Sequence, residues 1–245
     1  MSSNEWQELS GGLRKLITPW PGGHVNFRIL VSAVAGVAMS ATVAAAQVCQ
    51  GDLSFRGGST HVVGALGVSN NAKSFGGGAT FGHSQGWYGG GSVGMLSYDN
   101  VNGNSIVVGG GLGYSMPLQA RSKWQVCPGG TLSLGFGPTV NVGGASMHTS
   151  SQTASMGASF GTSLPLSKKV NLLPFGSVAL GYTRASVKLN GNSNSASDTY
   201  LLLGAGAGFQ LTPSLVLRPA LSLAAGADLI DDTVFSFGVT FALPR

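Results

Sequence analysis

Four segments of this chain alternate strictly between large apolar and small side chains. They span residues 154–164, 200–211, 215–224 and 234–243. The last segment shows the pattern most plainly, with two interleaved sets: Phe235, Phe237, Val239, Phe241 and Leu243 against Val234, Ser236, Gly238, Thr240 and Ala242. A period of two residues is typical of a β-strand whose two faces meet different surroundings. We therefore predict four strands, each with one apolar face and one small-residue face.

Six further segments alternate less regularly, and we expect a strand in each of them: about 57–69, 74–83, 87–99, 104–116, 124–137 and 170–188. A tilted strand needs about 9 to 11 residues to cross a membrane. Ten such strands would still leave enough chain for the connections between them. An even number of strands also keeps both ends of the chain on one side.

The small-residue faces carry almost no charge. Across the four regular segments, their single charged side chain is Arg218. A soluble β-sandwich exposes its non-core face to water, where about a quarter to a third of the residues are charged. In a transmembrane barrel the large apolar side chains face lipid, and small residues fill a narrow interior. The pattern favours an all-β fold, a closed antiparallel transmembrane β-barrel. A soluble, secreted Gly-rich β protein such as an adhesin module is the alternative.

Composition agrees with a folded chain of low charge. The 245 residues include 40 Gly, 9% are charged and 43% are hydrophobic. Disordered chains lack this hydrophobic content, and collagen needs a Gly at every third position, so neither class fits. Lys and Arg outnumber Asp and Glu by 13 to 8, but they are scattered, and we expect no nucleic-acid partner. The Gly-rich runs open no helix, so we expect no nucleotide, no cofactor and no metal.

The N-terminal region has the pattern of a secretory signal. Arg28 precedes an apolar run over residues 29–43, and the small residues Ala44, Ala45 and Ala46 follow it. This run is too short to span a membrane. We expect cleavage after Ala46. The chain then divides into an N-terminal extension with a signal peptide over residues 1–46 and a barrel over residues 47–245.

The predicted connections differ in length between the two ends of the barrel. Short ones, which we expect at the inner end, span residues 83–86, 117–123, 165–169 and 212–214. Mostly longer, polar ones, which we expect as outer loops, span residues 98–104, 137–153, 185–199 and 227–233. Only the connection at 70–73 is shorter than expected for an outer loop. Barrels of outer membranes have this asymmetry between short inner turns and long outer loops.

Prolines recur with a regular spacing along the chain. One set lies at the inner turns, and a second set follows it four or five residues into a strand; the two sets are Pro117, Pro165 and Pro213, and Pro128, Pro174 and Pro219. Proline cannot donate a hydrogen bond to a neighbouring strand. We expect these prolines to bulge or fray the barrel in a ring near its inner rim.

Aromatic residues lie near the predicted strand ends, as in the two aromatic girdles of a membrane barrel. The inner group is Trp87, Tyr88, Tyr114, Trp124, Phe209 and Phe241, and the outer group is Tyr98, Phe136, Tyr182, Tyr200 and Phe235.

The signal, the alternating strands, the unequal connections and the aromatic last strand together resemble the small outer-membrane β-barrel proteins of Gram-negative bacteria, the class with OmpA-like and OmpX-like barrels. The resemblance implies a barrel of about ten strands, or eight as in many members, in the cell outer membrane. Outer-membrane lipid, lipopolysaccharide and the barrel-assembly machinery are its implied partners, and we expect a monomer. In that class the last strand usually ends on Phe, whereas here Phe241 is followed by four more residues.

Some outer-membrane barrels are enzymes, either protease-like or lipid A-modifying, and this is an alternative function. The grouping that comes nearest to such a site is His148 with Asp231 and Asp232 on outer loops, since His61 and His83 lie elsewhere. Without a second nearby His, the geometry of a general base cannot be argued. The acidic outer loops are also a candidate for divalent cations that bridge lipopolysaccharide. We expect a non-catalytic protein with an envelope-structural, surface-interaction or narrow-pore role.

Cys49 and Cys127 are the two cysteines of the chain. An exported chain enters an oxidising compartment, where an even pair of isolated cysteines is most simply explained as a disulfide. Cys127 shares the inward parity of Thr131 and Ser133, so the bridge would draw residues 47–55 across the barrel mouth as a partial plug. Two unpaired buried thiols are the alternative.

Overall fold

The protein is a closed barrel of ten long antiparallel strands. The computed structural model describes residues 48–53, 59–83, 85–99, 101–118, 123–142, 145–189, 192–230 and 233–243. The long strands are β1 (Thr60–Ser69), β2 (Ala72–Gly82), β3 (Trp87–Tyr98), β4 (Val101–Tyr114), β6 (Trp124–Val142), β7 (Ala145–Thr162), β9 (Asn171–Leu189), β10 (Asn192–Thr212), β11 (Leu215–Ala225) and β12 (Thr233–Leu243). Two-residue strands β5 (Met116–Pro117) and β8 (Leu164–Pro165) and the 3-10 turn η2 (Val48–Gln50) complete the described elements.

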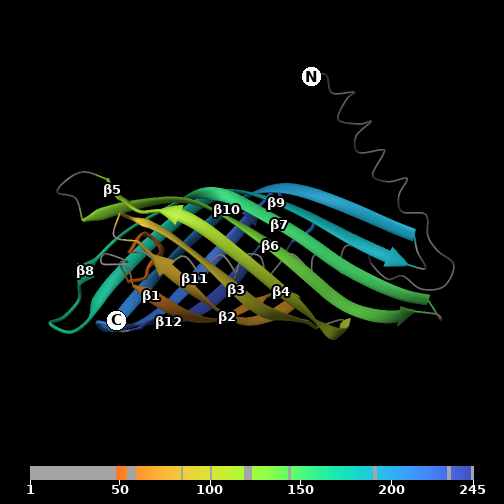
Figure 1. The fold of residues 1–245 in the computed structure, drawn as a ribbon, viewed down its shortest axis with the longest axis horizontal. Helices are drawn as coiled ribbons and strands as arrows, with labels where there is room; N and C mark the ends of the chain where they lie inside the picture. The colour runs from red at the N-terminus through yellow and green to blue at the C-terminus, as the bar shows by residue number, and fades with distance from the viewer. Residues whose placement is uncertain are drawn as a thin grey trace, which may run out of the picture.

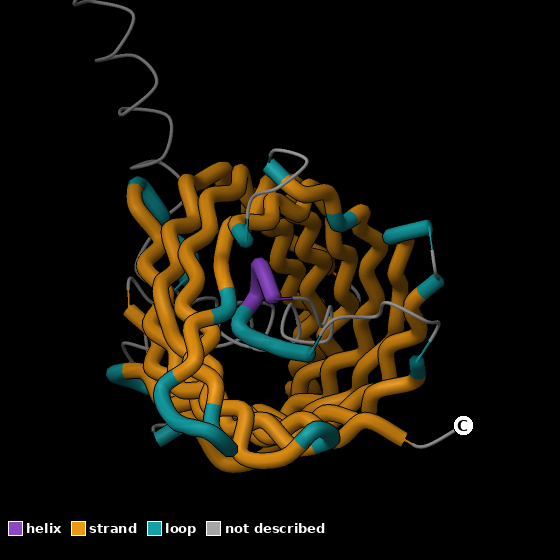
Figure 2. The backbone as a smooth tube through the Cα atoms, turned by 90° about the vertical axis from the view of Figure 1, so that its left-hand side faces the viewer, coloured by secondary structure: helices purple, strands orange, loops and turns teal. Residues whose placement is uncertain are grey.

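Each long strand pairs with the next one along the chain, and the ring closes between the first and the last (Figure 2). The closing ladder of β1 and β12 runs from Thr60 opposite Leu243 to Ser69 opposite Val234. The prediction of a closed antiparallel barrel is confirmed, with ten strands rather than eight. The predicted signal segment and its cleavage after Ala46 lie outside the described residues. No helix among those residues is long and apolar enough to cross a membrane.

The two faces of each strand have the surroundings that the alternation predicts. On β12, Phe237 and Phe241 are exposed at 38% and 46% on the outside, while Thr240 is fully buried on the inside. On β7, Met156 and Phe160 point outward and Ser159 is buried. The exterior is therefore a continuous apolar surface, as lipid requires, and the interior is lined with small residues.

The barrel has two different ends, which we call the plugged end and the protruding end. Residues 48–53 and the end of β12 lie at the plugged end, on the left of Figure 1. At the protruding end, β6, β7, β9 and β10 extend to the right well beyond the other six strands. These four strands have 18 to 21 residues, and the others have 10 to 14.

The prediction of long polar outer loops at 137–153 and 185–199 is wrong. These residues continue the strands: β6 ends at Val142 and β7 begins at Ala145, while β9 ends at Leu189 and β10 begins at Asn192. Ladders β6–β7, β7–β9 and β9–β10 run through both segments. The backbone can pair with adjacent strands even where the side chains are polar, and the resulting four-stranded extension is the protruding sheet. Polarity alone did not distinguish a solvated strand from a loop.

The recurring prolines interrupt the ladders, as predicted. Between β4 and β6, pairing stops at Gly113 opposite Gly129 and resumes in β5 at Met116 opposite Val126, which skips Pro128. Ladders further along skip Pro174 and Pro219 in the same way. In all three cases the break faces the preceding strand, because proline has no N–H to donate.

The prediction of two aromatic girdles is partly wrong. Trp87, Trp124, Phe136, Tyr182 and Phe235 are exposed on the outer surface, and the Trp87 and Tyr114 rings pack at 4.8 Å between centroids. Three tyrosines from the predicted girdles are instead buried: Tyr88, Tyr98 and Tyr200. They occupy inward positions of their strands. The alternation of inward and outward positions therefore predicts the burial of an aromatic residue better than its closeness to a strand end does.

The assignment of outward side chains to lipid predicts the effect of introducing a charge on the outer face. Phe237→Arg should lower the free energy of unfolding by about 2 to 4 kcal/mol, because the cation would face hydrocarbon near the middle of β12. Phe237→Leu, which keeps an apolar side chain, should cost less than about 1.5 kcal/mol. Equilibrium urea unfolding in lipid vesicles measures both.

Ser222→Arg is the matched change on the inner face and should cost less than Phe237→Arg, because its charge would enter the lumen. A larger loss for Ser222→Arg would show that the two faces have been exchanged.

Candidate functional site in the barrel lumen

Residues 48–53 lie inside the barrel, and we call them the plug. In the view along the barrel, η2 sits within the ring of strands (Figure 2). It packs against β6, β7 and β9. Cys49 and Asp52 are completely buried. The first described residues therefore fill part of the lumen at the plugged end.

A disulfide joins the plug to the barrel wall. Cys49 and Cys127 are bonded, with their Cα atoms 6.1 Å apart and a separation of 78 positions in sequence. Both cysteines are buried in a cluster with Tyr88. Cys127 is on the inner face of β6, the same face as the buried Ser133 and Gly135. The pairing is the one expected from the sequence, and its consequence, a plug drawn into the lumen, is also seen.

A buried ion pair holds the other end of the plug. Arg218 Nη1 lies 3.9 Å from Asp52 Oδ2 and donates a hydrogen bond to Gln50 O at 3.1 Å. Asp52 Oδ2 also accepts a hydrogen bond from Thr240 Oγ1 at 2.5 Å. Burial of a charge is costly unless an opposite charge and hydrogen bonds compensate it. Arg218, the lone charge on the small-residue faces, is thus explained by Asp52, a partner that the sequence analysis did not identify.

Apolar contacts and glycines fit the plug to the wall. Val48 and Leu53 are buried against Leu173 and Val216. A Cβ added at Gly161 would lie 2.5 Å from Val48 O. A Cβ at Gly208 would collide with Gly51 O. The wall lacks side chains at the two places where the plug backbone approaches it most closely.

The residues that hold the plug occupy equivalent places in the internal repeat. Cys127 precedes Pro128, Leu173 precedes Pro174, and Arg218 precedes Pro219. All three residues are buried on the inner face, and each lies beside a ladder interruption. Three copies of the repeated unit therefore each supply one contact to the plug: the first is covalent, the second is apolar and the third is ionic.

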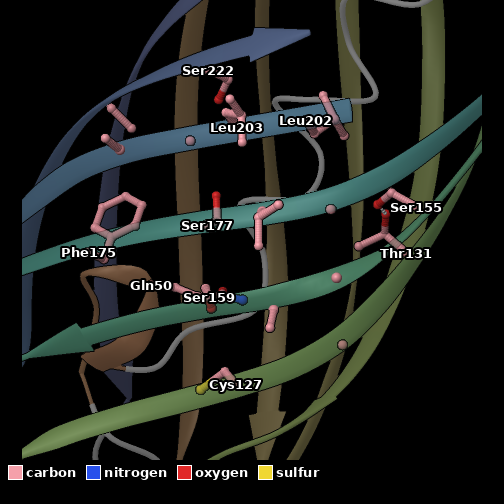
Figure 3. A pocket seen from close by; sticks show the side chains of 18 of the residues that line it. Gln50, Cys127, Thr131, Ser155, Ser159, Phe175, Ser177, Leu202, Leu203 and Ser222 are labelled. Carbon is pink, nitrogen blue, oxygen red and sulfur yellow. Dashed lines mark hydrogen bonds between the residues drawn. The ribbon is translucent and has the colours of Figure 1, made fainter. Parts of the chain in front are cut away.

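The plug leaves a small cavity in the lumen. Its volume is about 160 Å³, and its lining comes from the plug and the inner faces of several strands (Figure 3). Its polar side chains are Gln50, Arg218 and several hydroxyl groups. The hydroxyl groups include those of Thr131 and Ser155, whose oxygens are 2.7 Å apart, and that of Ser159, whose Oγ has no hydrogen-bond partner within the described residues. Such a lining suits water or another small uncharged polar molecule.

The structure describes the candidate histidines, but it leaves their predicted acidic partners undescribed. His148 lies on the protruding sheet and is hydrogen-bonded to Thr139 Oγ1 at 2.9 Å, while Asp231 and Asp232 lie outside the described residues. His83 is at a turn of the plugged end. His61 is buried in β1 beside Ser59, with Oγ and Nε2 3.0 Å apart. Within the described residues, no group of three His, Cys, Asp or Glu side chains could hold a metal ion.

The ion pair predicts that changing both partners costs less stability than the two single changes add up to. Arg218→Met or Asp52→Asn alone should lower the free energy of unfolding by about 3 to 5 kcal/mol, since each leaves a buried group without its partner. The double variant should cost clearly less than the sum. Urea unfolding of all three variants in vesicles gives the coupling energy.

Asp99→Asn is the control, because the Asp99–Lys73 pair is exposed and should contribute less than about 1 kcal/mol. Strict additivity of Asp52→Asn and Arg218→Met would contradict a coupled pair.

Removal of the disulfide should destabilise the protein. A variant with both Cys49→Ser and Cys127→Ser should lose up to about 4 to 5 kcal/mol in the free energy of unfolding, because the bridge closes a long loop. Thiol labelling of the denatured, unreduced wild-type chain should find no reactive thiol. Two labelled cysteines would contradict the bridge.

Comparison with solved structures finds distant similarities. Ail, the attachment invasion locus protein of Yersinia pestis, is 16% identical, with 76% of this chain and 97% of that chain covered and a TM-score of 0.39. The β domain of the Bordetella autotransporter BrkA is 13% identical over 76% and 99% of the two chains, with a TM-score of 0.48. The N-terminal barrel domain of Pseudomonas aeruginosa OprF is 13% identical over 76% and 97%, with a TM-score of 0.33. Comparison with curated proteins finds no match.

A family model gives a much broader match. The model described as the outer membrane protein beta-barrel domain covers residues 30–242, which is most of the chain and includes the ten long strands except the last residue of β12. The closed ring of strands, the apolar exterior and the small-residue lumen agree with that description. The protein therefore belongs to the outer membrane protein β-barrel domain family.

Proposed function

We propose that this outer-membrane barrel is a non-conducting, non-catalytic protein that displays its protruding sheet at the cell surface. The observation that carries the proposal is the plug, which is attached inside the lumen at one end, while the sheet extends from the other end. The barrel would then serve as a rigid base, and contacts with the surroundings would be made by the extension.

Three kinds of interaction support a permanently seated plug. The disulfide to Cys127 is covalent, the Asp52–Arg218 pair is fully buried, and Val48 and Leu53 pack into an apolar cluster. Release would expose all of these groups at once. A solute that crosses the barrel would have to displace them or pass beside them.

The construction of the protruding sheet supports a role outside the membrane. β4 pairs with β6 only as far as Ile106 opposite Phe136, and β11 pairs with β10 only from Leu201 onward. Beyond these points each outer strand of the sheet has no ladder partner on one side among the described residues. Unpaired backbone groups need water, because lipid provides no hydrogen bonds, so this part of the sheet stands clear of the hydrocarbon.

Polar groups partly protect the free edges of the sheet. Asp198 Oδ2 accepts hydrogen bonds from the Asp228 and Leu229 N–H groups at 2.7 and 3.3 Å, which ties the β11–β12 connection to β10. Pro138 on β6 has no N–H to offer a further strand. Such devices disfavour edge-to-edge pairing with other chains. The faces of the sheet, rather than its edges, are then the surfaces available for contact.

The surroundings of the described histidines support the non-catalytic part of the proposal. His61 lies beside the Ser59 hydroxyl, and His148 lies beside the Thr139 hydroxyl. Asp52 is hydrogen-bonded to Thr240 and paired with Arg218. The histidines of the described chain other than His61 lie at opposite ends of the barrel. A Ser–His pair needs an oriented acid and a place for the substrate, and His61 is 1% exposed.

A narrow pore is the second candidate function. The lumen cavity of about 160 Å³ and its hydroxyl lining favour it, because they would let water or a small neutral solute occupy part of the barrel. The two candidates differ in whether the seated plug stops passage.

Conductance distinguishes the two candidates. The oxidised full chain in planar lipid bilayers should show no steady channel current, because the plug is fixed at both ends. The variant Cys49→Ser, Cys127→Ser and Asp52→Asn should show intermittent current, because the covalent and ionic attachments are lost together. Heat-dependent migration on gels first establishes that each variant is folded.

Steady conductance by the oxidised wild type would refute the closed lumen and favour the pore. Asp99→Asn, which alters an exposed ion pair, is the control and should remain silent.

A further inference from the structure

Three serines lie side by side on the wall of the lumen cavity, and we call them the serine row: Ser159 on β7, Ser177 on β9 and Ser222 on β11. Ladder register places Ser159 opposite Ser177. It also places Gly204 of β10 between Ser177 and Ser222. All three serines line the cavity, and Figure 3 shows them one above another across the strands. Their side chains therefore form one band across four adjacent strands.

The glycine in the middle of the serine row leaves space between its hydroxyl groups. A Cβ at Gly204 would collide with Ser177 Oγ, so this hydroxyl group extends over the glycine on the side of β11. Gly204 itself is among the residues that line the cavity. The position without a side chain is therefore open to a molecule that bonds to Ser177 and Ser222 together.

The hydroxyl group at one end of the row lacks a bond. Ser159 is 4% exposed, and its Oγ has no hydrogen-bond partner in the part of the chain that the structure describes. Thr131 and Ser155, which also line the cavity, bond to each other instead. A buried hydroxyl group without a partner is unfavourable. A bound molecule that can both donate and accept a hydrogen bond would satisfy it.

The charge of the lining does not favour an ion. Among the described residues that line the cavity, Arg218 carries the one charge. Its Nη1 lies near Asp52 Oδ2 and donates a hydrogen bond to Gln50 O, so the plug compensates this cation. A charged ligand would leave water without an opposite charge to receive it, which is costly. The cavity therefore favours an uncharged molecule.

The dimensions of the serine row limit the size of the ligand. Three intervals of about 4.8 Å between strands make a row of up to about 14 Å. A hydrogen bond of about 2.8 Å at each end leaves up to about 8 Å for the ligand. The ring of Phe175 also lines the cavity and offers apolar surface to the carbon atoms of the ligand. A six-membered ring that carries several hydroxyl groups has these properties.

We propose that the lumen cavity binds a neutral polyol of about the size of a monosaccharide, with its hydroxyl groups bonded to the serine row. Each hydroxyl group of a polyol both donates and accepts, so one ligand can bond to several serines at once. The inference goes beyond the surface role of the protruding sheet and needs no passage through the barrel. The plug, which supplies Gln50 to the lining, would form part of the site.

Solution NMR of the isotope-labelled, folded full chain in detergent micelles tests this inference. The probes are three compounds with a six-membered ring: glucose, cyclohexanol with its single hydroxyl group, and glucuronate with its negative charge. Glucose should shift the backbone amide signals of the serine row saturably and should bind at least about tenfold more tightly than the other two. The triple variant Ser159→Ala, Ser177→Ala and Ser222→Ala should raise the Kd of glucose at least about tenfold, since each lost hydrogen bond contributes severalfold.

A second variant keeps all three hydroxyl groups and removes the space between them. Gly204→Ala should also raise the Kd of glucose, because the added methyl group displaces the Ser177 hydroxyl group. Ser92→Ala is the matched control: its Oγ is buried without a partner among the described residues, but Ser92 does not line the cavity. The Kd of this control should stay within twofold of the wild type. Heat-dependent migration on gels establishes that each variant is folded.

Absence of a saturable shift with glucose would show that the cavity holds water only and would overturn the inference. An unchanged Kd in the triple variant, or equally tight binding of cyclohexanol or glucuronate, would also overturn it. Each of these results would leave the conductance test of the closed lumen unaffected.

Discussion

Hydrocarbon offers no hydrogen bonds to the backbone, and this constraint governs the architecture of the protein. Every strand in the membrane must pair on both sides, so ten strands close into a ring through the β1–β12 ladder. Outside the hydrocarbon, water can bond to the backbone, and a strand no longer needs a partner on both sides. Beyond Phe136 on β6 and before Leu201 on β10, the described ladders on one side end, and the protruding sheet continues with two edges outside the ring. In the proposed arrangement, the sheet is the part of the barrel wall that leaves the membrane.

A ring of ten strands encloses more space than its small inward residues fill. Part of this space is taken by the plug, whose backbone reaches Gly161 and Gly208 of the wall. Its attachments have different physical roles. The disulfide restricts the unfolded chain, whereas a buried pair such as Asp52 and Arg218 adds little net stability and instead disfavours any other position of the plug, because displacement would leave both charges unpaired.

The internal repeat connects the wall with the plug. Pro128, Pro174 and Pro219 interrupt ladders at equivalent places, and the residue before each of them contacts the plug. The position before the proline is Cys, Leu or Arg in the three repeats, and these residues give three chemically different contacts. The ring of interruptions predicted near the inner rim is therefore also the ring that seats the plug.

Alternation in the sequence was enough to predict the barrel, the number of strands, the outward phenylalanines and the inward parity of Cys127. These features depend on contacts with lipid or with the next strand, and such contacts repeat every two residues. The sequence also determined which cysteines could pair, because it contains only two. Tertiary structure decided what lies across the lumen. Asp52 meets Arg218 over 166 positions, Tyr88 and Tyr200 turn inward, and polar segments 137–153 and 185–199 pair as strands. Local pattern carries no information about which inward side chains of distant strands face each other, because that depends on how the closed ring is filled.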